Sequence, residues 1–284
     1  MKERALVAFT LLAQAAVGAF WTLAAVYLLT WRQIGPATAR LHAVGGFVAV
    51  GALLVLAMGA ALLHLGSPLL AWRALANPRT SWLSREIWST LLLSGASILW
   101  AGLLWFERGS PFWRSMALGA AALLGLALLL TMSWAYRLRT VPAWNSWVTP
   151  LSFLVTTLLL GGLAAGLLVA LTPPLLGTPA VRLPGLPVGV ILLLCVEFLF
   201  LPLWLVELAG RSPAARAALA LLVRRHRVLL QLRLILMVVA VGLAGLLLTP
   251  WDSPALFLAL AGVAAAAEVL GRILFYAAYA REGV

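Results

Sequence analysis

Long apolar stretches, separated by short polar joints, make up almost the whole of this chain. Eight of these stretches are long enough to cross a bilayer core of roughly 30 Å at about 1.5 Å of helix rise per residue. Prolines fall in the joints or at the ends of the stretches, where helices usually stop. The transmembrane helices that we expect run over about residues 6–29, 43–64, 86–106, 112–136, 148–171, 187–207, 228–248 and 255–280.

The first stretch has two interpretations. A charged start, an apolar run and small residues near 13–16 together fit a secretory signal peptide. However, the apolar run continues to Leu29, which is longer than the 7–15 apolar residues typical of a signal. We therefore interpret it as the first transmembrane helix.

Composition supports a polytopic membrane protein. Of the 284 residues, 64% are apolar and only 10% are charged, whereas soluble domains have roughly 25% charged residues. We expect an all-α fold in which residues 1–284 form a single integral membrane domain, arranged as two four-helix bundles. The net charge of +12 comes almost wholly from arginine. Because the arginines lie in short loops between apolar stretches, they indicate membrane topology and not a nucleic-acid partner.

An even number of spans places both termini on one side of the membrane, here called the terminus side. Fourteen of the twenty cationic side chains are assigned to this side, Arg233 among them, and five to the other. The positive-inside rule then predicts that both termini are cytoplasmic.

Ligands for a metal or haem are scarce. A single cysteine, Cys195, cannot supply the four thiolates of an iron–sulfur cluster, and we expect it to be an inert core thiol. His42 and His64 lie at opposite ends of one predicted helix, about 33 Å apart by helix rise, so they cannot share a haem. No cluster of three zinc ligands is visible. We expect no metal and no cofactor bound by this chain.

The polar joint over residues 62–88, LLHLGSPLLAWRALANPRTSWLSREIW, stands out from this apolar background. His64 ends one span and Glu86 begins the next. Each has a simple structural explanation, since His64 could cap free carbonyls and Glu86 could interact favourably with a helix N-terminus. Together, at one membrane face, an imidazole and a carboxylate could accept the two protons released when a quinol is oxidised.

Further polar residues are expected at the same level. The residues that we expect to bind quinol or to support the site are Gly66, Ser67, Pro68, Trp82, Arg85, Trp144, Asn145, Glu268, Arg272 and Tyr276. Glu268 and Arg272 are four apart, which predicts an intrahelical ion pair. Glu197 lies in mid-span with no cation near it in sequence. Two roles are open for it, a permanently protonated carboxyl group or a step in a proton path.

Four motifs in order resemble the anchor subunit of bacterial dimethyl sulfoxide reductase. They are HLGSP at 64–68, SWLSREI at 81–87, TVPAWNSWVTP at 140–150 and EVLGRILFY at 268–276. The resemblance extends over nearly the whole chain, and polysulfide-reductase-type anchors are similar at a greater distance.

The resemblance implies a role in anaerobic respiration at the bacterial inner membrane. In this family a molybdopterin subunit reduces the terminal substrate, an iron–sulfur subunit relays electrons, and the haem-free anchor oxidises menaquinol. The family's quinol-site histidine and glutamate would correspond to His64 and Glu86. The resemblance also implies termini outside the cytoplasm, in contrast to the arginine distribution, so that the membrane side remains open.

Two other functions remain alternatives. A transporter could use Glu197, Glu268 and Arg272 to line a substrate path, although transporters often have helices broken at the midplane. A purely structural anchor would leave quinol oxidation to another subunit. Neither the terminal substrate nor the quinone type follows from the residues.

Overall fold

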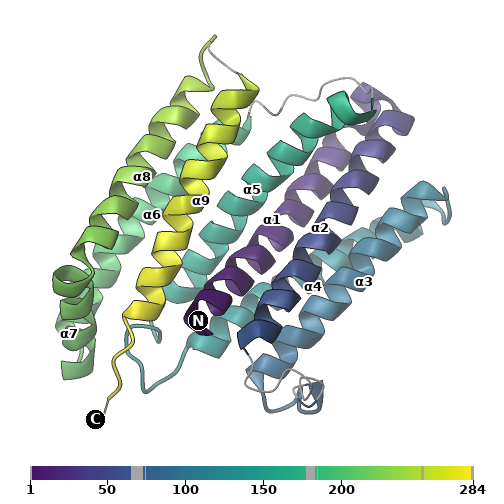
Figure 1. Ribbon diagram of the computed structural model, residues 1–284. Helices are drawn as coiled ribbons and strands as arrows, with labels where there is room; N and C mark the ends of the chain where they lie inside the picture. The colour runs from purple at the N-terminus through teal and green to yellow at the C-terminus, as the bar shows by residue number, and fades with distance from the viewer. Residues whose placement is uncertain are drawn as a thin grey trace.

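Helices make up nearly all of the described residues in the computed structural model, which covers residues 2–64, 73, 75–176, 183, 185–250 and 253–282 (Figure 1). Within these residues there is no β-strand, which confirms the predicted all-α class. The elements are α1 (Lys2–Ile34), α2 (Pro36–His64), α3 (Trp82–Trp105), α4 (Pro111–Tyr136), α5 (Val148–Leu176), α6 (Gly185–Gly210), α7 (Pro213–Ala220), the π-helix η2 (Leu221–Arg225), α8 (Arg227–Leu246) and α9 (Pro254–Ala277).

Eight of these helices are long and apolar enough to cross a membrane, as the sequence predicts. Most predicted spans agree with the observed helices to within a few residues. The second differs more, because α2 begins at Pro36 and not at residue 43. Proline is favoured in the first turn of a helix, and Gly35, with a φ of +82°, supplies the tight turn out of α1.

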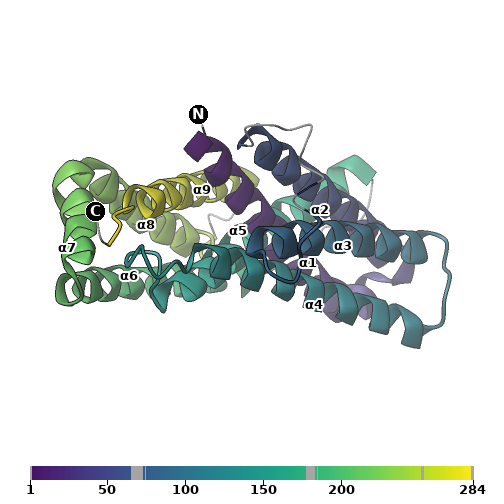
Figure 2. The ribbon, with the colours of Figure 1, turned by 90° about the horizontal axis from the view of Figure 1, so that it is seen from below.

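The helices form the two expected bundles. One buried core joins α1, α2, α3 and α4, and a second joins α6, α8 and α9. α5 belongs to both, since Phe153 packs in the first core and Leu159 in the second. Figure 2 shows α5 between the two groups of helices.

α1 and α5 approach each other backbone to backbone at two glycines. A Cβ atom added to Gly161 of α5 would overlap the backbone of Gly18 in α1, and one added to Gly18 would overlap the backbone of Thr157. Small residues at such crossings let two membrane helices approach backbone to backbone. The two bundles are therefore joined along a tightly packed seam.

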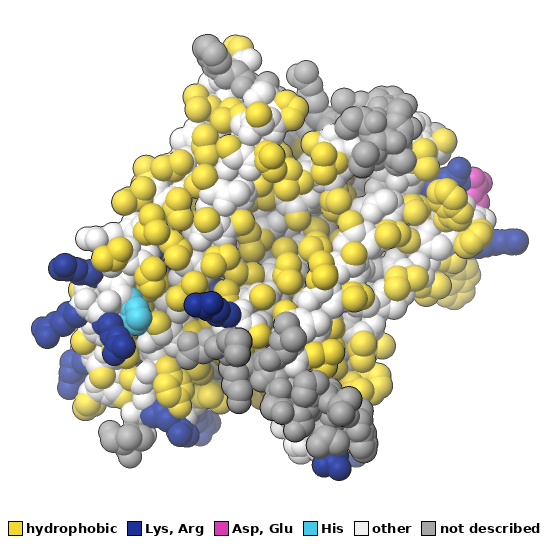
Figure 3. All heavy atoms as spheres, in the orientation of Figure 1, with side chains coloured by type: hydrophobic (Ala, Val, Ile, Leu, Met, Phe, Trp, Pro, Cys, Tyr) yellow, Lys and Arg dark blue, Asp and Glu magenta, His cyan; other side chains and the backbone are white. Residues whose placement is uncertain are grey.

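Both termini lie at the same end of the helices, the lower end in Figure 1, in agreement with eight crossings. α7 and η2 lie at this end too, and η2 carries Arg224 and Arg225. Figure 3 shows apolar side chains across the middle of one face, with basic side chains gathered towards the lower left. At the opposite end Arg40 forms an ion pair with Glu107.

Two sequence-based expectations are wrong at the level of placement. Cys195 is exposed on α6 and is not a core thiol, because its neighbour Leu194 takes the inward-facing position. Arg233 was counted with the terminus-side cations although it falls within the predicted span 228–248; it lies inside α8 and forms an ion pair with Glu197.

Candidate functional site

Glu86 lies in the first turns of α3, at the terminus-side end of the membrane span. Ser81 caps this helix, accepting a hydrogen bond from the backbone N–H of Ser84, so α3 starts before the residue that the hydropathy pattern indicates. Glu86 is only 4% exposed, and its Oε1 has no hydrogen-bond partner among the described residues. A buried carboxylate oxygen of this kind is available to a donor from a ligand.

A hydrogen-bonded pair of tyrosines lies at the terminus-side ends of α4 and α9. Tyr276, near the end of α9, donates a hydrogen bond of 2.8 Å to the hydroxyl of Tyr136, the last residue of α4. Both hydroxyls are within electrostatic range of the Glu86 carboxylate. Residues from α3, α4 and α9 thus lie towards the terminus-side end of the helices, within electrostatic range of one another.

Aromatic rings surround the tyrosine pair. Trp144 stacks on Phe275 with ring centroids 5.6 Å apart and an interplanar angle of 17°, and its Nε1 donates to the Phe275 carbonyl at 2.7 Å. Tyr136 makes edge or tilted contacts with Trp144, Phe153 and Phe275. Such rings give a rigid, flat-walled environment on which a planar ring can stack.

Arg272 borders this aromatic cluster and does not form the intrahelical pair predicted with Glu268. No ion pair between the two occurs in the described structure. Instead Arg272 donates to Gln14 Oε1 of α1 at 2.5 Å and lies over the Phe153 ring, 3.9 Å from its centroid. Gln14 Nε2 in turn donates to the Phe153 carbonyl at 2.8 Å. The prediction fails because cross-helix partners satisfy the guanidinium better than its own helix does.

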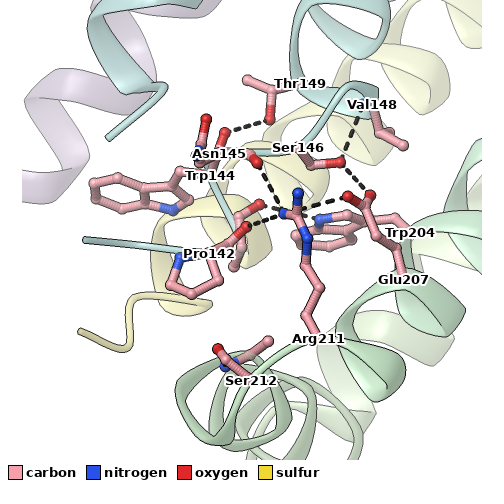
Figure 4. A network of polar contacts seen from close by, with 12 residues as sticks. Pro142, Trp144, Asn145, Ser146, Val148, Thr149, Trp204, Glu207, Arg211 and Ser212 are labelled. Carbon is pink, nitrogen blue, oxygen red and sulfur yellow. Dashed lines mark hydrogen bonds and ion pairs between the residues drawn. The ribbon is translucent and has the colours of Figure 1, made fainter. Parts of the chain in front are cut away.

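The loop between α4 and α5 is fastened to the end of α6, as Figure 4 shows. Ser146 donates to Glu207 Oε2 at 2.5 Å, and Arg211 forms an ion pair with the same carboxylate at 3.2 Å. Arg211 also donates to the carbonyl oxygens of Pro142 and Asn145. Asn145 therefore contributes through its backbone, and the network holds Trp144 in place against α9.

A second polar cluster lies deeper, between α5, α6, α8 and α9. Arg233 of α8 is 2.8 Å from Glu197 Oε2 and 3.8 Å from Glu268 Oε1, while Thr156 of α5 donates to Glu268 Oε2 at 2.6 Å. These residues and Arg272 line a cavity of about 60 Å³. The structure thus brings together the three residues of the transporter alternative, with Arg233 added.

Trp82 and Arg85 make contacts near the start of α3 that do not include Glu86. Arg85 donates to the carbonyl oxygens of Pro78 and Arg79, and its guanidinium lies 4.3 Å from the centre of the Trp82 ring. They shape the polar joint that leads to Glu86. The side chain of His64, and the whole of Gly66, Ser67 and Pro68, lie outside the described residues.

Four partners of the site were not expected from the sequence. They are Arg233, which was counted only as a terminus-side cation, and Gln14, Thr156 and Tyr136, which were not among the candidate site residues. The one available signal was the position of Gln14 and Arg233 within membrane spans, where polar side chains are rare. Among the described residues there is no cluster of three or more His, Cys, Asp or Glu side chains that could bind a metal ion.

Comparison with known proteins adds the family. The model of the DMSO reductase anchor subunit (DmsC) family matches residues 1–278. The C chain of anaerobic dimethyl sulfoxide reductase from Escherichia coli is 30% identical over 298 aligned positions, which cover 99% of this chain and 96% of the relative.

Two other relatives match over shorter regions. The C chain of anaerobic dimethyl sulfoxide reductase from Haemophilus influenzae is 31% identical over 57% of this chain and 56% of its own length. The C subunit of sulfite dehydrogenase from Allochromatium vinosum is 34% identical over 51% of this chain and 47% of its own length. The chain thus spans about half the length of these two relatives and nearly all of the relative from Escherichia coli. The chain belongs to the DMSO reductase anchor subunit (DmsC) family.

Proposed function

We propose that this multi-pass membrane protein anchors a molybdoenzyme reductase complex and oxidises menaquinol at the terminus side of the bacterial inner membrane. Its electrons would pass to an iron–sulfur subunit, and a molybdopterin subunit would reduce the terminal substrate. The observation that carries this proposal is the buried Glu86 carboxylate, which has a free oxygen and lies within electrostatic range of the Tyr136–Tyr276 hydroxyl pair.

The chemistry required is the loss of two protons and two electrons from each quinol. A quinol hydroxyl would donate a hydrogen bond to the free oxygen of Glu86, which then accepts its proton as a general base. The tyrosine hydroxyls would orient the head group, and the rings of Trp144 and Phe275 would provide a stacking surface. His64 ends α2 at the same end of the membrane and is the proposed acceptor of the second proton.

The electrons need a carrier outside this protein. With one cysteine, it cannot hold an iron–sulfur cluster, so that a partner must receive the electrons close to the quinol. The terminus-side end, with its exposed arginines on α7 and η2, is the surface that would face that partner.

Glu86→Gln tests this function directly. The amide has nearly the same shape but cannot accept a proton, and general bases typically contribute 10²–10⁴-fold to rate. We expect quinol-dependent turnover of the assembled complex to fall at least a hundredfold on this scale. Turnover with reduced viologen, which delivers electrons to the partner subunits directly, should stay at the wild-type rate.

Glu107→Gln, at the opposite end of the membrane, is the matched control and should retain both activities. Unchanged quinol-dependent turnover in Glu86→Gln would contradict the proposal and favour the purely structural anchor. Co-purification of the protein with molybdenum-containing and iron–sulfur subunits would exclude the transporter alternative.

A further inference from the structure

The deeper polar cluster contains two carboxyl groups that face one cation between them. Glu197 is 4% exposed and Glu268 is 2% exposed, and they come from different helices, α6 and α9. Arg233 lies 2.8 Å from the first and 3.8 Å from the second. Buried ionisable residues in a membrane span are costly, and they commonly mark ion or proton paths.

The pair has one close cation for two carboxyl groups. Arg233 lies at hydrogen-bond distance from Glu197 but 3.8 Å from Glu268 Oε1. Neither Glu197 Oε1 nor Glu268 Oε1 receives a hydrogen bond from a donor in the described structure. Burial disfavours a second carboxylate charge that is not fully paired, so the two groups are suited to hold one proton.

Space for water adjoins the pair. The cavity of about 60 Å³ is lined by both glutamates and by three hydroxyl groups of α5, those of Thr149, Ser152 and Thr156. A single water needs roughly 10–15 Å³ of such space, so the cavity can hold several.

The three hydroxyl groups lie in a row along α5. Residues three and four apart share one face of a helix, so Thr149, Ser152 and Thr156 follow one another from the first turn of α5 inwards. The row spans about 10 Å along the helix and ends at Thr156, which donates to Glu268. Hydroxyl groups and water can pass protons because each both donates and accepts hydrogen bonds.

We propose that the cavity between α5, α6, α8 and α9 is a hydrated proton-exchange site, in which Glu197 and Glu268 share one proton taken up from the terminus side along the hydroxyl row. The step is a simple transfer. A hydronium ion gives its proton to a carboxylate, leaving water and a carboxylic acid, and no electron moves.

The charges around the pair are few. Arg233 faces it from α8, and Arg272 lines the same cavity from α9. α5 contributes hydroxyl groups and no charge, and Gln14 of α1 binds Arg272. In a static ion-pair network both carboxyl groups would remain ionised at neutral pH and above, and this is the competing description.

Infrared difference spectroscopy of the full-length protein in lipid nanodiscs distinguishes the two descriptions. In a Glu86→Gln background, which removes the other buried carboxyl group among the described residues, we expect a carbonyl stretch of a protonated carboxylic acid to appear between high and neutral pH, shifted to lower frequency in D₂O. Glu197→Gln and Glu268→Gln should each abolish this band, whereas the surface variant Glu107→Gln should retain it. A missing band, or a band that survives both cavity variants, would overturn the proposal.

Cysteine accessibility tests the water path without altering the carboxyl groups. In a Cys195→Ala background, Ser152→Cys would place a thiol in the cavity, and Leu151→Cys would place one at the same depth on the exposed outer face of α5. A water-soluble thiol reagent should label position 152 much faster than position 151. Equal or slower labelling at 152 would overturn the hydrated path.

Neither measurement uses quinol. The proton-exchange site is therefore tested independently of the quinol site at Glu86, which is tested by turnover.

Discussion

The hydrogen bond between Tyr136 and Tyr276 joins two residues that are 140 positions apart in the chain. It joins the terminus-side ends of α4 and α9. It also gives the proposed quinol site its pair of neutral hydroxyl groups. A hydroxyl that already donates to another is left with a free acceptor and a fixed orientation. Tyr276 therefore positions Tyr136 to donate to a ligand.

Tyr276→Phe removes the donor of this pair while keeping the ring. A neutral hydrogen bond contributes about 1 kcal/mol, or roughly a fivefold effect on an equilibrium. We expect the KM for quinol, and the Kd of a quinol analogue, to rise by about that factor in Tyr276→Phe. The Tyr136→Phe/Tyr276→Phe double variant should lose less than the sum of the two single variants, because they share one bond. Strict additivity would contradict the coupling.

Individual residues could be predicted better than their partners could. Glu86, Glu268 and Arg272 stood out because charged side chains are rare in apolar helices. Their contacts did not follow, because sequence spacing reports only neighbours on the same helix. Arg272 therefore pairs with Gln14, 258 positions away, and Glu197 with Arg233 of another helix.

Among the helices, α5 determines how the bundles meet. It gives Gly161 to the contact with α1, Phe153 to the first core and Thr156 to the deeper polar cluster. Hydropathy predicted the α5 span well, but it could not predict that α5 belongs to both bundles. Sharing of this kind depends on which face meets which partner, and an apolar helix presents nearly the same composition on every face.

Gly161→Ala tests the α1–α5 contact. The added methyl group would overlap the backbone of Gly18, and overpacking of this kind typically costs about 1–3 kcal/mol. We expect a lower midpoint of thermal unfolding in detergent. Gly242→Ala is the matched control, since a Cβ there meets nothing within 4 Å and alanine is the better helix former. Equal midpoints for the two variants would show that the helices are not in close contact.

At the scale of the whole molecule, charge is concentrated at one end. The terminus-side end carries the basic α7 and η2 segment, while the other end has an ion pair of Arg40 and Glu107. Helix number and direction could be predicted from the sequence alone, since eight apolar stretches return the chain to the side where it began. The pairing of helices across the two bundles could not, because it depends on contacts between distant segments.

Cysteine labelling in membrane vesicles checks this arrangement. In the Cys195→Ala background, Arg139→Cys and Arg281→Cys should react with an impermeant reagent from one side, and Glu107→Cys from the other. The same measurement assigns the terminus side to the cytoplasm or to its opposite. Labelling of positions 139 and 281 from different sides would contradict eight crossings.

The backbone contact between Gly18 and Gly161 also has a mechanical consequence. A transporter that works by alternating access needs an interface at which one half of the protein moves against the other. Here Gln14 ties α1 to the Phe153 carbonyl of α5 and to Arg272 of α9 close to that contact. Helices from both halves are clamped together, so the halves cannot swing apart. This packing disfavours the transporter alternative and agrees with a protein whose proposed reaction needs no movement of one half against the other.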